Sequence, residues 1–193
     1  MIAADRFIVS SQTKQLWLAE RDKGVTATQV ARAATPAGME AELKAMSEPQ
    51  PVYVNAMMLW GIEREPWIAH HVKDEFGVLP NDWLIRSEQA AWHLATPDGL
   101  SLNHKVIGEY KTSGKPLDKI PVHYMRQIQW QLHVTGADYC VFAYELRVDT
   151  PTGYAPGFDI PTQIVERDDK EIAKLILVAE QLQEHAVNLS ATA

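Results

Sequence analysis

Two acidic residues and a lysine lie at a spacing that could build a hydrolytic site. Asp98 stands between a proline and a glycine, and Glu109 and Lys111 follow it after ten intervening residues. Alternate residues of a strand share a face, so Glu109 and Lys111 would point the same way while Tyr110 points the other way. A hairpin-like connection would return Glu109 beside Asp98, and two carboxylates and an ammonium group would then meet.

Such a group suits a site for a divalent cation, a phosphate and a water. Carboxylate oxygens are hard ligands that favour Mg²⁺, and bound cations stabilise the charge that develops on phosphoryl oxygens. By itself the spacing also arises by chance in a chain with 25 acidic residues, where it would mark only a surface salt bridge. The preceding Val106, Ile107 and Gly108 indicate an interior strand, in which Glu and Lys rarely lie without a partner or a task.

The hydrophobic pattern predicts the elements that would position these residues. Helical spacing is expected over residues 12–20, 26–34, 37–46, about 53–76 with a kink or a new start at Pro66, 119–135 and 168–185. Strands are expected over residues 83–88, 91–96, 106–111, 139–146 and 162–166. This order predicts an α/β fold with a central mixed β-sheet flanked by helices on both sides.

Composition limits the class of protein. The chain has 193 residues, of which 46% are hydrophobic and 22% charged, as in ordinary globular domains. Its only cysteine, Cys140, excludes a disulfide framework and a four-cysteine zinc site, and the seven histidines show no metal-ligand spacing. No apolar run is long enough to span a bilayer and the start lacks the features of a signal peptide, so we expect a cytoplasmic protein. The net charge of −7 argues mildly against indiscriminate nucleic-acid binding, but it allows a local site.

Six segments, in order along most of the chain, carry a recognisable set of motifs. They are Trp17-x3-Arg21-x2-Gly24-x-Thr26-Ala27-Thr28, Leu59-Trp60-Gly61-x3-Glu65, Thr96-Pro97-Asp98-Gly99-Leu100, Glu109-Tyr110-Lys111, the stretch Tyr124 to Gly136, and Val165 to Asp169. Together they resemble the lambda exonuclease and YqaJ-like viral recombinase family of PD-(D/E)xK nucleases. The chain departs from that pattern where Gly24 lies one place later, where Pro66 follows Glu65, and in a short linker between Lys111 and Tyr124.

The resemblance implies a restriction-endonuclease-like (PD-(D/E)xK) fold, with residues 1–193 as a single nuclease domain. It also implies catalytic roles. Asp98, Glu109 and the backbone carbonyl of Tyr110 would hold Mg²⁺, with Mn²⁺ as a substitute. Glu65 would complete the carboxylate set, and Lys111 would orient or help deprotonate the attacking water.

A second implied site binds the 5′-phosphate of a DNA end. Its residues would be Arg21, Thr28, Thr96 and Gln127, and an arginine with short donors suits a dianionic phosphate. Other DNA-proximal residues implied by the motifs are Tyr124 and Gln131. Without the resemblance, Arg21 would be read as a surface ion-pair residue, and Tyr124, Gln127 and Gln131 as one solvated face of a helix.

The function implied is Mg²⁺-dependent 5′–3′ digestion of double-stranded DNA, which leaves 3′ single-stranded overhangs for phage-type homologous recombination. The resemblance further suggests a ring-shaped homotrimer, a single-strand annealing protein as partner, and a phage or prophage gene expressed in a bacterial cell. Two alternatives stay open. One is an endonuclease or other DNA-repair nuclease of the same fold, which would have no use for a terminal-phosphate pocket. The other is a catalytically silent DNA-end-binding recombination module, against which the joint presence of Asp98, Glu109 and Lys111 argues.

Overall fold

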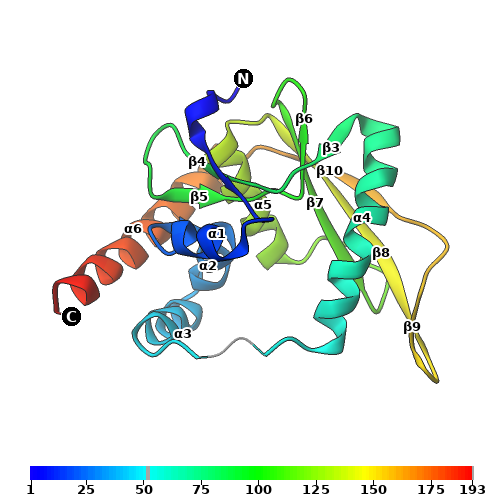
Figure 1. Ribbon diagram of the computed structural model, residues 1–193, viewed down its shortest axis with the longest axis horizontal. Coiled ribbons are helices and arrows are strands. Elements are labelled where there is room, and N and C mark those ends of the chain that lie inside the picture. The colour runs from blue at the N-terminus through cyan, green and yellow to red at the C-terminus, as the bar shows by residue number, and fades with distance from the viewer. Residues whose placement is uncertain (51–52, 193) are drawn as a thin grey trace.

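The computed structural model describes residues 1–50 and 53–192 and places two β-sheets among six α-helices (Figure 1). The helices are α1 (Lys14–Arg21), α2 (Ala27–Ala33), α3 (Pro36–Ser47), α4 (Ala56–Phe76), α5 (Val122–Thr135) and α6 (Asp169–Thr192), with a short 3₁₀ helix η1 (Ala4–Arg6). The strands are β1 (Phe7–Ser10), β2 (Val25–Thr26), β3 (Val78–Pro80), β4 (Trp83–Arg86), β5 (His93–Ala95), β6 (Gly99–Ser101), β7 (Val106–Ser113), β8 (Tyr139–Thr150), β9 (Gly153–Pro156) and β10 (Thr162–Glu166).

The larger sheet is mixed, as the sequence predicted. Its strand order is β10-β8-β7-β6-β3, and β9 pairs with the outer part of β8. Strand β6 forms a hairpin with β7 in which Gly99 faces Gly108, and β7 runs parallel to β8 through the crossover helix α5. The smaller sheet has the order β1-β4-β5-β2. The prediction of a mixed α/β fold is therefore confirmed.

Helices cover both faces of the central strands. Ile107 and Phe142 face α5 within the main core, whereas Val141 and Ala143 pack against the inner side of α4 at Ile68. All five side chains are essentially excluded from solvent. Burial on both faces explains why β7 and β8 read as nearly continuous apolar runs, and it leaves Glu109 in a strand that has no solvated face at that position.

A pair of glycines makes room for one aromatic ring beside the hairpin. A methyl group added to Gly99 or Gly108 would lie 2.3 or 2.4 Å from the hydroxyl oxygen of Tyr110, far inside van der Waals contact. The Tyr110 ring thus lies across the Gly99–Gly108 pair on the α4 face of the sheet. This packing sends the neighbouring side chains, Glu109 and Lys111, to the opposite face.

Helix α4 passes through Pro66, where the sequence predicted a kink or a new start. No new start occurs there: a single helix runs from the Asn55 cap, whose Oδ1 accepts a hydrogen bond from Met58 at 2.9 Å, to Gly77 in the left-handed conformation. Pro66 is exposed, and the next turn is held in the core by Ile68 and its neighbours. Packing of that turn therefore offsets the hydrogen bond that proline removes.

Other differences concern short or extended elements. The strands β1, β2, β3, β6 and β9 hold two to four residues each and were not predicted, because such lengths carry no readable periodicity. Strand β8 continues to Thr150 and α6 to Thr192, beyond the predicted ends at 146 and 185. Within the described ranges, none of the helices combines the length and apolar character that crossing a membrane requires.

Candidate active site

The structure brings Asp98, Glu109 and Lys111 together. Asp98 lies just before β6, and its Oδ2 accepts a hydrogen bond of 2.7 Å from the backbone N–H of Tyr110 on β7. Glu109 has no solvent exposure, and its Oε1 is hydrogen-bonded to the Lys111 ammonium. The β6–β7 hairpin thus produces the convergence of two carboxylates and an ammonium that the spacing predicts.

The pKa values show how strongly these groups interact. The pKa of Asp98 is raised well above its ordinary value, first by burial of the carboxyl and then by the nearby charge of Glu109. Burial alone would lower the pKa of Lys111, but Glu109 and Asp98 outweigh that effect and raise it. An added cation would stabilise the charged form of the buried Asp98 carboxyl.

Helix α5 holds Glu109 in place from the other side of the site. The side-chain amides of Gln127 and Gln131, one helical turn apart, donate to its Oε1 and Oε2, each at 2.7 Å. Tyr124, one turn earlier, lies under Lys111, with the ammonium 5.3 Å from the ring centroid. The polar side chains on this face of α5 therefore contact Glu109 and Lys111 instead of forming a solvated surface.

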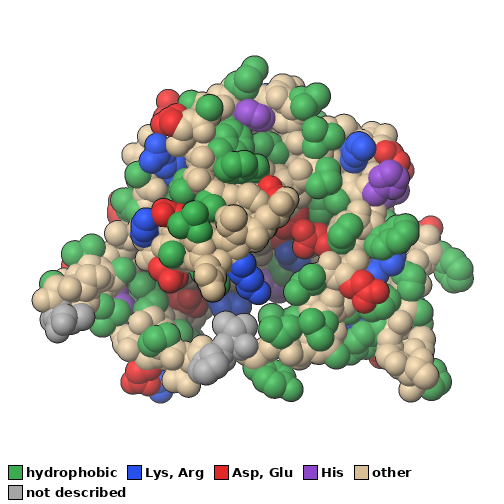
Figure 2. Space-filling model, in the orientation of Figure 1, with side chains coloured by type: hydrophobic (Ala, Val, Ile, Leu, Met, Phe, Trp, Pro, Cys, Tyr) green, Lys and Arg blue, Asp and Glu red, His purple; other side chains and the backbone are tan. Residues whose placement is uncertain are grey.

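A pocket of about 500 Å³ opens beside these residues, between α1, α2, α4 and α5. Its wall contains every candidate for 5′-phosphate binding, namely Arg21, Thr28, Thr96 and Gln127. The same wall holds Gln131 and the three carboxylates of Glu65, Asp82 and Asp98. In the space-filling view the molecule is hollowed between the N-terminal helices and α4, with acidic and basic side chains at the bottom (Figure 2). We call this hollow the Arg21 pocket.

Arg21 lies over the ring of Trp17, 4.2 Å from its centroid. Burial lowers the pKa of Arg21 and the neighbouring Asp22 partly offsets that shift. In the part of the chain that the structure describes, Arg21 makes no ion pair within 4 Å, so the surface ion pair considered as an alternative does not form. A guanidinium stacked on an aromatic ring and free of acidic partners is suited to bind an anion.

Glu65 reaches the Arg21 pocket from α4. The residue is exposed overall, yet the pocket wall removes enough water from its carboxyl to raise its pKa, against a lowering effect of Lys111. Among the described residues, no three acidic, histidine or cysteine side chains form a complete metal cage. The structure therefore does not gather Glu65 with Asp98 and Glu109 into the three-carboxylate set that was predicted. The metal ligands predicted beside it, Asp98, Glu109 and the Tyr110 carbonyl, include only two acidic side chains.

The chemistry of that donor set fits a hard divalent cation. Oε1 of Glu109 accepts from both Lys111 and Gln127, whereas Oε2 accepts only from Gln131 and so keeps one of its about two acceptor positions. The Oε1 atom of Gln131 is buried without a hydrogen-bond partner at the same place. Oxygen ligands without histidine or thiolate favour Mg²⁺ or Mn²⁺ over Zn²⁺.

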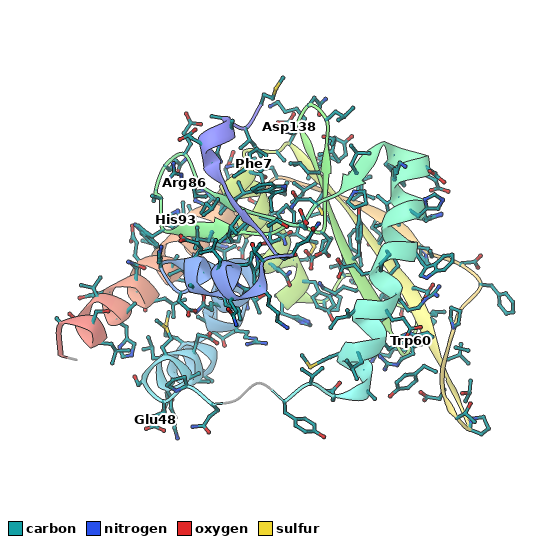
Figure 3. All side chains as sticks on the ribbon, viewed as in Figure 1. Phe7, Glu48, Trp60, Arg86, His93 and Asp138 are labelled. Carbon is teal, nitrogen blue, oxygen red and sulfur yellow. The ribbon has the colours of Figure 1, made fainter. Side chains whose placement is uncertain are left out.

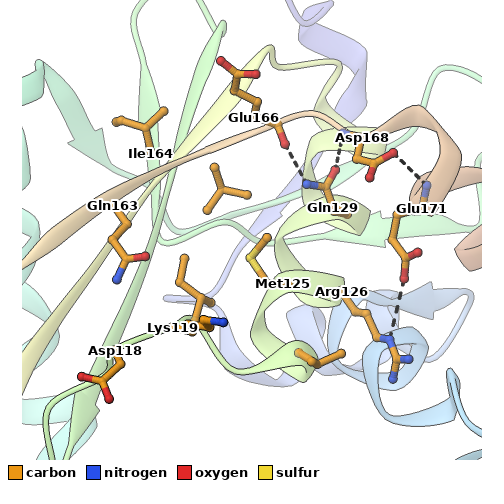
Figure 4. Close-up of a pocket in the computed structure, with 13 residues that line it drawn as sticks. Asp118, Lys119, Met125, Arg126, Gln129, Gln163, Ile164, Glu166, Asp168 and Glu171 are labelled. Carbon is orange, nitrogen blue, oxygen red and sulfur yellow. Dashed lines mark hydrogen bonds and ion pairs between the residues drawn. The ribbon is translucent and has the colours of Figure 1, made fainter.

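A larger pocket on the far side of α5 carries none of these candidates (Figure 4). Its volume is about 580 Å³, and it lies between α5, β10 and the start of α6. Gln129 crosses it, donating to the Glu166 carbonyl and accepting from the Asp168 N–H, both at 2.8 Å. Arg126 of α5 contacts Glu171 of α6 at 3.8 Å in the same pocket and so joins the two helices.

Several charged contacts were not predicted from the sequence. Arg64 of α4 makes two hydrogen bonds, of 2.8 and 2.7 Å, to Glu145, which is only 2% exposed. His93 and His133 share a buried hydrogen bond of 2.9 Å between their rings. In each case the partners are far apart in the sequence, so local patterns do not reveal the pairing. Only Glu145 stands out in the sequence, because it is an acidic residue within an apolar strand.

The comparisons with known proteins agree with this geometry. The model of the YqaJ-like viral recombinase domain matches residues 16–138. An alkaline exonuclease from Laribacter hongkongensis is 25% identical with a TM-score of 0.71, and the match covers 92% of this chain and 95% of that one. The structure of that exonuclease in complex with dAMP is 26% identical over the same shares, with a TM-score of 0.67.

A third solved structure extends the likeness of fold. A phage-related exonuclease from Haemophilus somnus has a TM-score of 0.68 at 15% identity, covering 88% of this chain and 96% of that one. Among curated proteins, none matches the chain by sequence. The fold is the restriction-endonuclease-like fold of the alkaline exonucleases, and the family supports nuclease activity. The chain belongs to the YqaJ-like viral recombinase family.

Proposed function

We propose that this protein is a Mg²⁺-dependent exonuclease that digests double-stranded DNA from 5′ ends and leaves 3′ single strands for recombination. The observation that carries the proposal is one pocket in which Arg21 lies beside Asp98 and Glu65. An unpaired arginine next to a hydrolytic site suits an enzyme that binds a chain end. An endonuclease would gain nothing from such a residue there.

Each side chain has a task that follows from its surroundings. A cation held by Asp98, Glu109 and the Tyr110 carbonyl would supply stabilisation of the charge developing on the phosphoryl oxygens. The ammonium group of Lys111 is hydrogen-bonded to Glu109 beside this position, which suits orienting a water and stabilising an anion. Gln131 fixes the carboxylate of Glu109, and fixed donors cost no reorganisation during the reaction.

The 5′-phosphate would bind to Arg21, with the hydroxyl groups of Thr28 and Thr96 as further donors. Gln127 would contribute less than the sequence suggests, because its amide already donates to Glu109. A charge-assisted hydrogen bond is worth about 1.5–3 kcal/mol, which corresponds to a preference of about 10- to 100-fold for a 5′-phosphate over a 5′-hydroxyl end.

The test compares cleavage rates on linear duplexes with the two kinds of end. Wild type should prefer the phosphorylated duplex by about 10- to 100-fold, and Arg21→Ala should lose most of that preference while keeping residual cleavage. Arg32→Ala, which removes an exposed arginine outside the pocket, is the matched control. Equal rates of wild type on the two ends, or unchanged preference in Arg21→Ala, would exclude this role of Arg21.

The assembly and the biological setting are also proposals. Family membership favours a ring-shaped homotrimer, a single-strand annealing protein as partner, and action in the cytoplasm of a bacterial cell. Light scattering on the purified chain measures the first of these: a mass of about 65 kDa, three times 21.7 kDa, is expected. A stable monomer that digests DNA would contradict the ring.

A further inference from the structure

A second pocket, of about 440 Å³, adjoins the Arg21 pocket and includes Lys111 in its wall. The two pockets share Ile62 and Glu65 of α4 as a common wall. From there the second pocket runs along the edge of β7 at Lys111 and Thr112 and ends at Arg147 of β8. We call it the Arg147 groove.

Arg147 is the positively charged end of this groove. Its guanidinium lies 4.8 Å from the ring centroid of Tyr154, which in turn packs edge-on against Trp60 at 5.9 Å. Trp60 points from α4 toward the β8–β9 hairpin in the side-chain view (Figure 3). The ring of Tyr154, on which the guanidinium lies, is thus itself packed against a second aromatic ring.

The hydrogen-bonding groups of Arg147 are poorly satisfied. Among the described residues, its one hydrogen-bond partner is the sulfur of Met57, 3.3 Å from Nη2, and a thioether is a weak acceptor. Its Nε is buried and has no hydrogen-bond partner. Within the described residues no carboxylate lies within 4 Å of it, whereas Arg64, on the same side of the sheet, is fully paired with Glu145.

The pattern along β8 shows why Arg147 is left over. Alternate residues share a face, so Val141, Ala143, Glu145 and Arg147 all point toward α4. Val141 and Ala143 fill the core beneath α4, and Glu145 pairs with Arg64. Arg147 comes next in the series, before Asp149, with which it forms no ion pair within 4 Å among the described residues, and α4 supplies methionine rather than an acid there.

The walls of the groove indicate the kind of ligand. Met57, Met58 and Ile62 give it an apolar side, and hydrophobic side chains gather over this half of α4 beside the central hollow (Figure 2). Lys111, Thr112 and Arg147 give it a side of donors. A sugar–phosphate backbone matches such a groove. Each of its phosphodiesters carries one negative charge, which one arginine can bind, and the apolar side of the groove offers no set of donors that could read a base.

We propose that the Arg147 groove binds the DNA strand beyond the scissile bond, with Arg147 on the backbone phosphate next to the one that is cleaved. This inference rests on the proposed exonuclease function, since it takes the terminal nucleotide to occupy the Arg21 pocket. The strand then passes from one pocket to the other over Asp98, Glu109 and Lys111. Arg147 is a positioning residue in this arrangement and touches no reacting atom.

The test replaces one phosphate by an uncharged methylphosphonate at the second internal linkage from the 5′ end of the cleaved strand. For wild type the replacement should raise the KM for a 5′-phosphorylated duplex about 10-fold, the value of one charge-assisted contact, and leave kcat nearly unchanged. Arg147→Met should raise the KM for the normal duplex by a similar factor, lower the salt slope of binding by about one unit, and be insensitive to the methylphosphonate. The control Arg32→Met, with the same change of charge, should behave as wild type.

Arg147→Lys is the second variant, which keeps the charge and should retain part of the effect. The preference for 5′-phosphate over 5′-hydroxyl ends should stay the same in both Arg147 variants. Equal sensitivity of wild type and Arg147→Met to the methylphosphonate would overturn the assignment. Duplex binding in Ca²⁺, measured by fluorescence anisotropy on the same substrates, gives the same comparison without cleavage. Suppose that wild-type binding is weakened by the methylphosphonate, that Arg147→Met binding is not, and that wild type does not cut in Mg²⁺. That result would refute the exonuclease function and leave the Arg147 contact established.

Discussion

The amide of Gln131 offers a sharp perturbation of the site, because among the described residues its one hydrogen bond is to Glu109, a predicted metal ligand. Gln131 is 1% exposed, and Gln131→Leu keeps its approximate size while removing the 2.7 Å hydrogen bond to Glu109 Oε2. A hydrogen bond to a charged group contributes about 1.5–3 kcal/mol, which corresponds to a fall of about 3–12 °C in Tm for a chain of this length. If the same bond fixes Glu109 in the transition state, kcat should fall about 10- to 100-fold with little change in KM.

Gln129 on the same helix provides the control. It is also buried and loses two hydrogen bonds in Gln129→Leu, but these join α5 to β10 and α6, away from the site. We expect a similar loss of thermal stability and an unchanged kcat per folded molecule, measured well below both transitions on an end-labelled duplex. Equal effects of the two variants on kcat, or a normal kcat in Gln131→Leu, would refute the positioning of Glu109 by this amide.

The remaining predictions concern the lysine, the glycine pair, the buried histidines and the cation. Lys111→Ala should lower the rate of cleavage by at least about 100-fold while binding of DNA ends persists, as filter binding would show; wild-type rates would refute its role. Gly108→Ala should lower the unfolding free energy by about 1–3 kcal/mol because its methyl group would overlap Tyr110, whereas Gly61→Ala, whose methyl would lie 3.7 Å from Thr112, should not; urea titration distinguishes them. Burial lowers the pKa of His93 and of His133 to about 4 from 6.5, so the folded state binds fewer protons than the unfolded chain. Their contribution is complete above pH 6.5 and is lost as the pH falls toward 4, on the order of 3 kcal/mol for one ring at about 1.4 kcal/mol per unit; a His133→Phe variant with the same pH dependence of unfolding as wild type would contradict it. Ca²⁺ in place of Mg²⁺ should support DNA binding but not cleavage, and cleavage that survives EDTA would exclude a metal mechanism.

The sequence predicted the parts of the fold that depend on local pattern. Long periodic segments such as α5 and α6, and the apolar runs of β7 and β8, were recognisable because their hydrophobic residues repeat at helix or strand spacing. The meeting of Asp98 with Glu109 followed from strand geometry alone. The new start considered at Pro66 does not occur, because the burial of Ile68 and the turns after it keeps α4 continuous through the proline.

Partners that lie far apart in the chain were beyond reach of such patterns. Nothing local indicates that Gln127 and Gln131 donate to Glu109 rather than to DNA, since a polar helix face looks the same in both cases. His93 and His133 read as unrelated residues until the fold joins them. Arg147 likewise stands out only in the folded structure, where no carboxylate among the described residues lies within 4 Å of it and its Nε has no partner.

The most direct test of the proposed function is a time course of cleavage of a linear duplex that carries 5′-phosphates. One strand is labelled at its 5′ end in one sample and at its 3′ end in another, and a covalently closed circular duplex is the control substrate. With Mg²⁺, the account predicts early release of 5′-labelled mononucleotide, gradual shortening of the 3′-labelled strand and an intact circle. Asp98→Asn should show none of this activity. Cleavage of the circle, release from the 3′ end, or activity in Asp98→Asn would contradict the exonuclease assignment.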